Sequence, residues 1–250
     1  MPVRPTIQQL RTAIAALEHS EAVRAIPFGV PVIDAVLPGG GLPVASLHEV
    51  GGAGLDAEFA ATPALFAAGI LARHPGPVLW VLERPDLFAP ALAAAGLHPD
   101  RVIYAEAGRS QALLAMEEGL RHPGLAGVVA EVSGRVTLTA SRRLHLAAQA
   151  GGALAFLVRR GSEPDGAMAA VTRWRVGPAS SAPPMPGRPT VPGLGPPRWT
   201  LELTRCRGGQ TGSWIVEACD ATGRLGLVPA LAHGSDRPAL ARTPTRHGRA

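Results

Sequence analysis

The sequence predicts an α/β fold: a mostly parallel sheet flanked by helices, with an antiparallel β-hairpin near the C-terminus. Short, uninterrupted apolar segments alternate with helical segments along much of the chain, a pattern typical of parallel strands covered on both faces. Two later segments alternate apolar with polar residues on either side of a glycine-rich turn, which predicts the hairpin. The chain has 250 residues, of which 46% are hydrophobic, so it can bury one large core.

Each element has its own local signal. A first strand is expected from Ser46 to the turn at Gly51, and further uninterrupted apolar strands at 78–82, 102–104, 127–130 and 154–158. Asp86 is expected to cap a helix that ends at Ala95, before Gly96. Other helices are expected at 110–120 and 139–150. An alternating strand at 169–176 precedes the hairpin, whose strands are expected at 199–205 and 213–218.

The chain is expected to divide into an N-terminal amphipathic helix and hinge at 1–24, a core domain at 25–228 and a disordered tail at 229–250. Prolines, glycines and serines at 177–198 predict an exposed loop within the core domain. The N-terminal helix begins with a capping box at Thr6 and Gln9. Its narrow apolar face must be covered, and we expect it to bind a protein partner or a second copy through Ile7, Leu10, Ile14 and Leu17.

A glycine-rich turn follows the first core strand and has the layout of a phosphate-binding P-loop. A functional loop of the form G-x-x-x-x-G-K-[ST] needs a lysine for the phosphates and a hydroxyl for Mg²⁺. The glycines here are Gly51, Gly52 and Gly54, but the second-glycine, lysine and hydroxyl positions hold Asp56, Ala57 and Glu58. The chain has no lysine at all. Since carboxylates repel a polyphosphate, we expect a degenerate P-loop with no ATP cofactor and no catalytic residue.

Two interpretations of this turn remain open. Its backbone amides and the following helix N-terminus could still hold an anion. We favour the alternative, a structural relic whose carboxylates favour the positive end of the helix dipole. Glu83 and Glu131 end two strands at the sheet edge where an active ATPase would use carboxylates to orient water and hold Mg²⁺. Without a phosphate cradle, we interpret both as vestigial.

The chain is basic, with a net charge of +5 and a pI of about 10.7, all of it from arginine. This charge invites nucleic acid, although abundant Ala, Gly, Pro and Arg is also what GC-rich coding produces. Six arginines, several of which follow predicted strand ends, are candidates for non-specific DNA contact: Arg159, Arg160, Arg173, Arg175, Arg205 and Arg207. The alternative is solvated charge, since the loop at 162–166 is short and acidic and few aromatic side chains lie nearby.

The two cysteines, Cys206 and Cys219, and the eight histidines lack the spacing of a metal site. We expect inert thiols in a reducing compartment, with a disulfide between paired strands as the alternative. The N-terminus resembles no signal peptide, and no apolar segment is long enough to span a bilayer. We expect a cytoplasmic protein without a membrane partner, nucleoid-associated when engaged with DNA.

Several segments resemble one family. The segment 26–37, followed by Gly39-Gly40-Gly41-Leu42-Pro43, resembles the lead into the P-loop of RecA-type proteins. The strand that ends at Glu83 continues the resemblance to RecA-type proteins. Two C-terminal segments make the resemblance more specific to one family within that class: 198–205 and Gly212-Ser213-Trp214. Over roughly 26–228 the sequence resembles the ImuA family, RecA-like accessory proteins of bacterial damage-inducible mutagenesis cassettes.

The resemblance implies a non-catalytic adaptor in SOS-induced, error-prone translesion DNA synthesis. The implied partners are an ImuB-type relative of Y-family polymerases and an error-prone DnaE-type polymerase, with RecA and weakly bound DNA as further candidates. Two alternatives stay open: a divergent ATP-binding RecA-type ATPase or recombinase, and a non-specific DNA-binding module.

Overall fold

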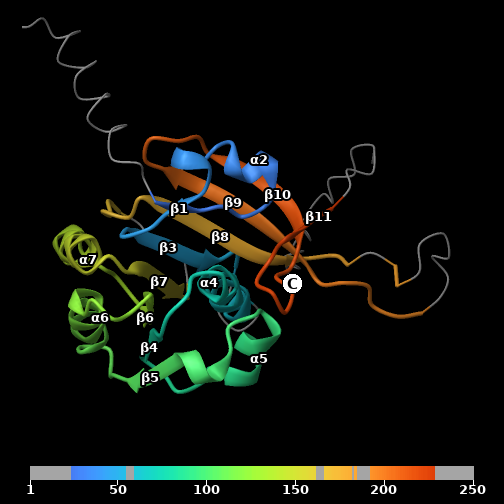
Figure 1. Ribbon diagram of the computed structural model, residues 1–250. Helices are drawn as coiled ribbons and strands as arrows, with labels where there is room; N and C mark the ends of the chain where they lie inside the picture. The colour runs from blue at the N-terminus through green and yellow to red at the C-terminus, as the bar shows by residue number, and fades with distance from the viewer. Residues whose placement is uncertain (1–23, 55–58, 162–165, 182, 185–191, 229–250) are drawn as a thin grey trace, which may run out of the picture.

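The computed structural model describes residues 24–54, 59–161, 166–181, 183–184 and 192–228 (Figure 1). In this part of the chain a nine-stranded sheet has the order β11–β10–β9–β8–β3–β7–β6–β4–β5. The parallel strands are β3 (Leu47–Gly52), β4 (Val78–Leu82), β5 (Val102–Glu106), β6 (Gly127–Ser133), β7 (Leu154–Arg160) and β8 (Thr172–Ala179). The antiparallel extension consists of β9 (Arg198–Cys206), β10 (Gly212–Glu217) and β11 (Gly226–Leu227). The predicted α/β class and hairpin are confirmed.

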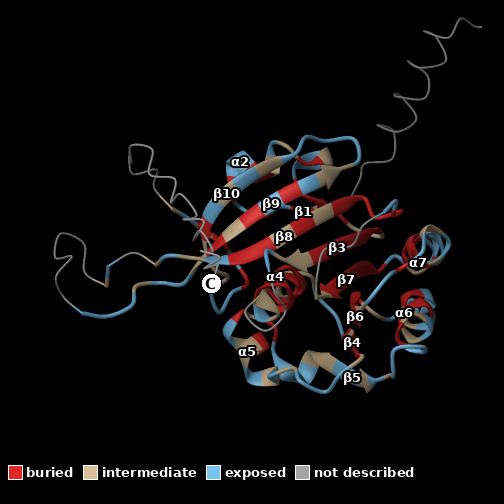
Figure 2. Cartoon of the chain, turned by 180° about the vertical axis from the view of Figure 1, so that it is seen from behind, coloured by how far each residue is buried: buried red, intermediate tan, exposed pale blue. Residues whose placement is uncertain are grey.

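Helices cover both faces of the parallel part of the sheet (Figures 1 and 2). One face carries α4 (Ala61–Ala72) and α5 (Ala89–Ala94), and the other carries α6 (Ala112–Arg121) and α7 (Leu138–Gly151). Because successive strand residues point to opposite faces, the sheet divides the buried apolar residues into two cores. The α4 side contains the large aromatics, and the α6–α7 side is filled by Leu, Val, Ala and Met.

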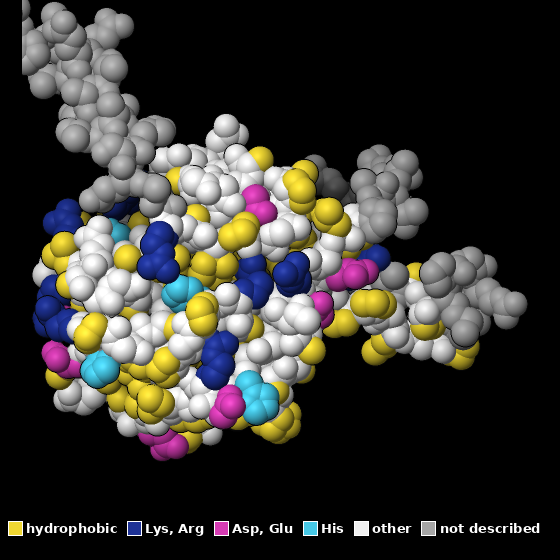
Figure 3. Space-filling view, viewed as in Figure 1, with side chains coloured by type: hydrophobic (Ala, Val, Ile, Leu, Met, Phe, Trp, Pro, Cys, Tyr) yellow, Lys and Arg dark blue, Asp and Glu magenta, His cyan; other side chains and the backbone are white. Residues whose placement is uncertain are grey.

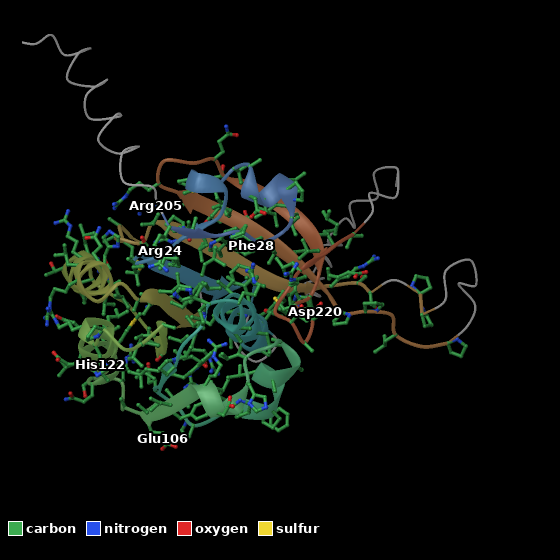
Figure 4. The ribbon with its side chains drawn as sticks, in the orientation of Figure 1. Arg24, Phe28, Glu106, His122, Arg205 and Asp220 are labelled. Atoms are coloured by element: carbon green, nitrogen blue, oxygen red, sulfur yellow. The ribbon has the colours of Figure 1, made fainter. Side chains whose placement is uncertain are left out.

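An N-terminal segment closes the aromatic core. Its short strands β1 (Ala25–Ile26) and β2 (Leu42–Pro43) pair antiparallel, and α2 (Pro31–Asp34) and a 3₁₀ turn at Pro38–Gly40 lie between them in the chain. A second 3₁₀ turn, at Pro99–Arg101, precedes β5. The buried Phe28, labelled in Figure 4, places its ring centroid 5.8 Å from that of Phe66 and 5.4 Å from that of Trp174. The Asp34 carboxylate accepts a hydrogen bond from the Phe28 N–H over 2.6 Å, which holds this turn in place.

Two local expectations were wrong. Asp86 does not cap α5, because that helix begins at Ala89 after Phe88 without a side-chain cap, and the Asp86 carboxylate pairs with Arg160 instead. The loop predicted at 177–198 begins later than its composition indicates, since β8 continues to Ala179 and Arg198 belongs to β9. Gly177 and Pro178 are accommodated because this part of β8 extends beyond the end of β3, whose pairing with β8 stops at Val176. They pair instead with Thr200 and Trp199 of β9.

Candidate functional site

The glycine-rich turn at the end of β3 is closely packed. Ala53 donates its N–H to the carbonyl of Val176 on β8 over 3.1 Å. A Cβ built on Gly54 would lie 2.5 Å from the Phe59 ring, and one built on Gly52 would lie 2.9 Å from the Phe59 Cβ. Phe59 therefore packs against the glycines of the turn. Asp56, Ala57 and Glu58 lie outside the described residues.

The residues present do not fit a Mg²⁺–nucleotide. The chain has no lysine, and Phe59 packs against Gly54 with its ring and against Gly52 with its Cβ, where the amides of the turn would have to face a phosphate. Helix α4 begins at Ala61 without a side-chain cap, and its Thr62 hydroxyl donates to the Val176 carbonyl over 2.9 Å. The hydroxyl nearest the turn is thus used in joining α4 to β8.

Of the two predicted carboxylates, Glu131 lies on β6 and Glu83 directly follows the neighbouring strand β4, and both accept hydrogen bonds within the protein. Glu131, 2% exposed, accepts from the Trp80 indole N–H over 2.8 Å and pairs with Arg160 over 2.8 Å. Arg160 also pairs with Asp86 over 2.8 Å, and this contact lowers the Asp86 pKa. Burial raises the pKa of Glu83, but hydrogen bonds from the Ser133 N–H (2.7 Å) and hydroxyl (2.5 Å) outweigh burial and lower it. Both carboxylates are thus engaged within the protein.

A separate cluster of charge lies on the opposite face of the sheet, on the neighbouring strands β7, β3 and β8. A cavity of about 270 Å³ lies there. The charged residues that line it, within the described part of the chain, are three arginines and one carboxylate: Arg159, Arg173, Arg175 and Glu49. Arg173 Nε lies 2.5 Å from Glu49 Oε2, and Arg159 Nε lies 3.8 Å from Glu49 Oε1. Burial lowers the pKa of Arg159 while Glu49 opposes that shift; a guanidinium remains charged in proteins.

The six candidate DNA-contacting arginines do not form one surface. Arg160 lies on the α4–α5 face and Arg159, Arg173 and Arg175 on the other, whereas Arg205 and Arg207 line a groove of about 440 Å³ beside α7. On the face seen in Figure 3, arginine side chains are spread over several places. The apolar face predicted at Ile7, Leu10, Ile14 and Leu17 lies outside the described residues.

Sequence reasoning did not predict the roles that three polar residues, Glu49, Asp86 and His48, have at these strands. Glu49 and Asp86 bind the arginines named above. His48, fully buried, donates from Nε2 to the Pro43 carbonyl and accepts at Nδ1 from the Thr172 hydroxyl, both over 2.8 Å. The available signal was the His48-Glu49 pair inside an otherwise apolar strand, because buried polar groups require partners.

The cysteines Cys206 and Cys219 are free, so the alternative of a disulfide is not realised. Within the described residues, no three His, Cys, Asp or Glu side chains are grouped so that they could hold a metal ion. No helix in the described part of the chain has the length and apolar character needed to cross a membrane.

The sheet order, the glycine-rich turn after β3 and the carboxylates at the ends of β4 and β6 define a RecA-like α/β protein with a degenerate P-loop. Proteins named ImuA from two strains of Caulobacter vibrioides are each 42% identical to the chain over 210 residues, covering 78% of this chain and 84% of theirs. The chain therefore belongs to the ImuA family, as its sequence predicted. No family model matches it.

Proposed function

We propose that this protein is a non-catalytic RecA-like adaptor that bridges the proteins of SOS-induced, error-prone translesion DNA synthesis. Membership of the ImuA family supports the pathway. The Arg160 guanidinium, held between Glu131 and Asp86, is the observation that carries the non-catalytic role. An arginine already neutralises the carboxylate that an ATPase of this fold would use for Mg²⁺.

The rest of the turn supports the same conclusion. Phe59 packs on Gly52 and Gly54, and both carboxylate oxygens of Glu83 accept hydrogen bonds from Ser133. ATP turnover would need a cation to replace the missing lysine and release of Glu83 from Ser133. A platform without turnover keeps its shape, which suits a protein that holds other proteins together.

Nucleotide binding tests the non-catalytic role directly. Titration of the protein with a fluorescent ATP analogue, with and without Mg²⁺, should show no binding up to millimolar concentration, and steady-state hydrolysis should equal that of buffer. A RecA-type ATPase measured in parallel validates the assay. Mg²⁺-dependent binding with hydrolysis that Glu83→Gln abolishes would instead establish the divergent ATPase.

Partner binding tests the adaptor role. We propose that the ImuB-type polymerase relative and the DnaE-type polymerase bind this protein, with RecA as a further partner, and that the N-terminal apolar face contributes to one of these contacts. Leu10→Asp with Ile14→Asp should reduce co-purification of a partner or self-association, because two charges then interrupt the apolar face. Gln8→Asp with Thr12→Asp adds the same charge at the same spacing on the polar face and should leave co-purification unchanged. Equal behaviour of the two double variants would overturn this assignment.

A further inference from the structure

Among its described lining residues, the cavity beside the turn contains more positive than negative charge. Glu49, Arg159, Arg173 and Arg175 share the α6–α7 face, because Val50, Val158 and Trp174 at alternate positions enter the aromatic core. Arg159 and Arg173 both lie within 4 Å of Glu49, and Arg175 lies 3.9 Å from the half-exposed Glu202. Among the cavity's described lining residues, three guanidinium groups thus face one carboxylate.

Arg159 is the residue whose donors are least satisfied. Its side chain is 4% exposed, and its Nη2 donates to the Gly134 carbonyl. Its Nε and Nη1 have no hydrogen-bond partner within the described part of the chain. Glu49 Oε2 is engaged by Arg173 over 2.5 Å, whereas Glu49 Oε1, 3.8 Å from Arg159 Nε, is beyond hydrogen-bond distance of it. A buried guanidinium with two unused donors is costly unless an acceptor reaches it.

The cavity has room for such an acceptor. Gly51, Gly52, Gly161 and Gly166 line it without side chains, and a Cβ built on Gly161 or Gly166 would meet nothing within 4 Å. Its volume of about 270 Å³ greatly exceeds the ~30 Å³ that one water occupies in the liquid. Two of its lining residues, Gly166 and Thr204, are exposed at the surface.

We propose that this cavity binds a phosphate group between the Arg159, Arg173 and Arg175 side chains. Guanidinium groups donate paired, charge-assisted hydrogen bonds that match the several acceptor oxygens of a phosphate. The site lies on the opposite face of the sheet from Glu131 and Arg160, so it differs from a nucleotide site built around those residues. The phosphate comes either from a free small molecule or from the backbone of single-stranded DNA.

Binding of two probes at low ionic strength tests the proposal. Pyrophosphate is titrated by calorimetry, and a fluorescein-labelled single-stranded oligothymidylate by anisotropy. Arg159→Gln should weaken binding about tenfold or more, and the more exposed Arg175→Gln severalfold, because each removes charge-assisted hydrogen bonds. Arg142→Gln removes an exposed arginine of α7 outside the cavity and should leave affinity unchanged. Circular dichroism establishes that each variant is folded.

Glu49→Gln should change the affinity for the probes in the opposite direction to the arginine variants. It therefore tests the proposal even if Arg159→Gln does not fold. Removing the carboxylate should tighten binding severalfold, because repulsion of the phosphate is lost while the shape is kept. Unchanged or weaker binding by Glu49→Gln would contradict the proposal.

The probes also distinguish the two sources of phosphate. Binding of pyrophosphate alone assigns a free phosphate compound, and binding of the oligonucleotide, alone or with pyrophosphate, assigns backbone phosphate. The proposal fails if neither probe binds, or if Arg159→Gln and Arg175→Gln bind as the wild type does. It also fails if binding arises only in Glu163→Gln with Asp165→Asn, since a carboxylate of this chain would then hold the arginines.

Discussion

Arg160 of β7 donates to the carboxylate of Glu131 on the neighbouring strand β6, with Nη1 and Oε2 2.8 Å apart. The two side chains are 12% and 3% exposed, so the pair is largely withdrawn from water. Trp80 of β4 donates to the other carboxylate oxygen, Oε1, over 2.8 Å. Three adjacent strands are thus joined by one buried carboxylate.

Loss of Arg160 should destabilise the fold. Arg160→Met leaves Glu131 buried without its counter-ion, which should lower the free energy of unfolding by about 3–5 kcal/mol. The double variant Arg160→Met with Glu131→Gln should recover part of this loss, because the neutral amide retains an acceptor for Trp80. Urea unfolding monitored by circular dichroism measures both. Equal stability of the single and double variants would contradict this prediction, because the carboxylate left without Arg160 would then carry no penalty.

Acidification should destabilise the protein through His48. Burial lowers the pKa of His48 to about 4 from its ordinary value of 6.5, so the neutral ring is favoured in the folded state. The contribution of the neutral His48 ring to the free energy of unfolding is fully present above pH 6.5. It is lost as the pH falls toward 4, by up to about 3 kcal/mol. The free energy of unfolding, measured at intervals between pH 7 and pH 4.5, should fall accordingly.

A matched pair of variants isolates the contribution of His48. His48→Gln should be less stable at pH 7 yet show a flatter pH dependence, because the group that titrates is gone. His98→Gln replaces an exposed histidine and should keep the wild-type slope. The lowered pKa values of His74 and His145 act in the same direction, so a residual slope is expected in both variants.

Docking of the N-terminal segment should depend on Phe28. Its ring is 1% exposed between Phe66 and Trp174, so Phe28→Ala should cost about 3–5 kcal/mol of unfolding free energy. Phe88, which is 70% exposed, serves as the control, and Phe88→Ala should change stability by less than about 0.5 kcal/mol. Urea unfolding followed by tryptophan fluorescence compares them; similar midpoints for the two variants would contradict the packing described.

The Cys219 thiol should not react with thiol reagents in the folded protein. Burial raises its pKa to about 12, so its thiolate fraction at pH 8 is on the order of 1 in 10⁴. A Cβ on Gly69 would lie 2.2 Å from its sulfur, which shows how closely α4 covers it. In a Cys206→Ser variant, Ellman's reagent should therefore titrate one thiol in urea and none at pH 8 without denaturant. Rapid native labelling would show that this contact opens readily.

The sequence predicted the fold better than it predicted the site. Uninterrupted apolar runs correctly placed β4, β6 and β7, because strands buried on both faces require apolar residues throughout. An apolar run also placed β5, although this edge strand is half-buried to exposed. Asp86 was misassigned as a cap because a helix start is a local signal, whereas its partner Arg160 is 74 residues away. Arg159, Arg160 and Arg205 lie near the ends of their strands, whereas Arg173 and Arg175 lie within the first half of β8. The distribution of the arginine candidates over two faces and a separate groove was not predicted.

The sequence by itself determined the α/β class, the order of strands and helices, the absence of a P-loop lysine and the family, since each depends on periodicity or residue identity along the chain. Only the tertiary structure decided which charges meet. Glu49, Arg159 and Arg173 come from three strands, and Glu49 and Arg173 are 124 residues apart in the chain. The pairing register of β3 with β7 and β8 places them on one face of the sheet. No local pattern encodes that register, because it follows from how all the strands pack together.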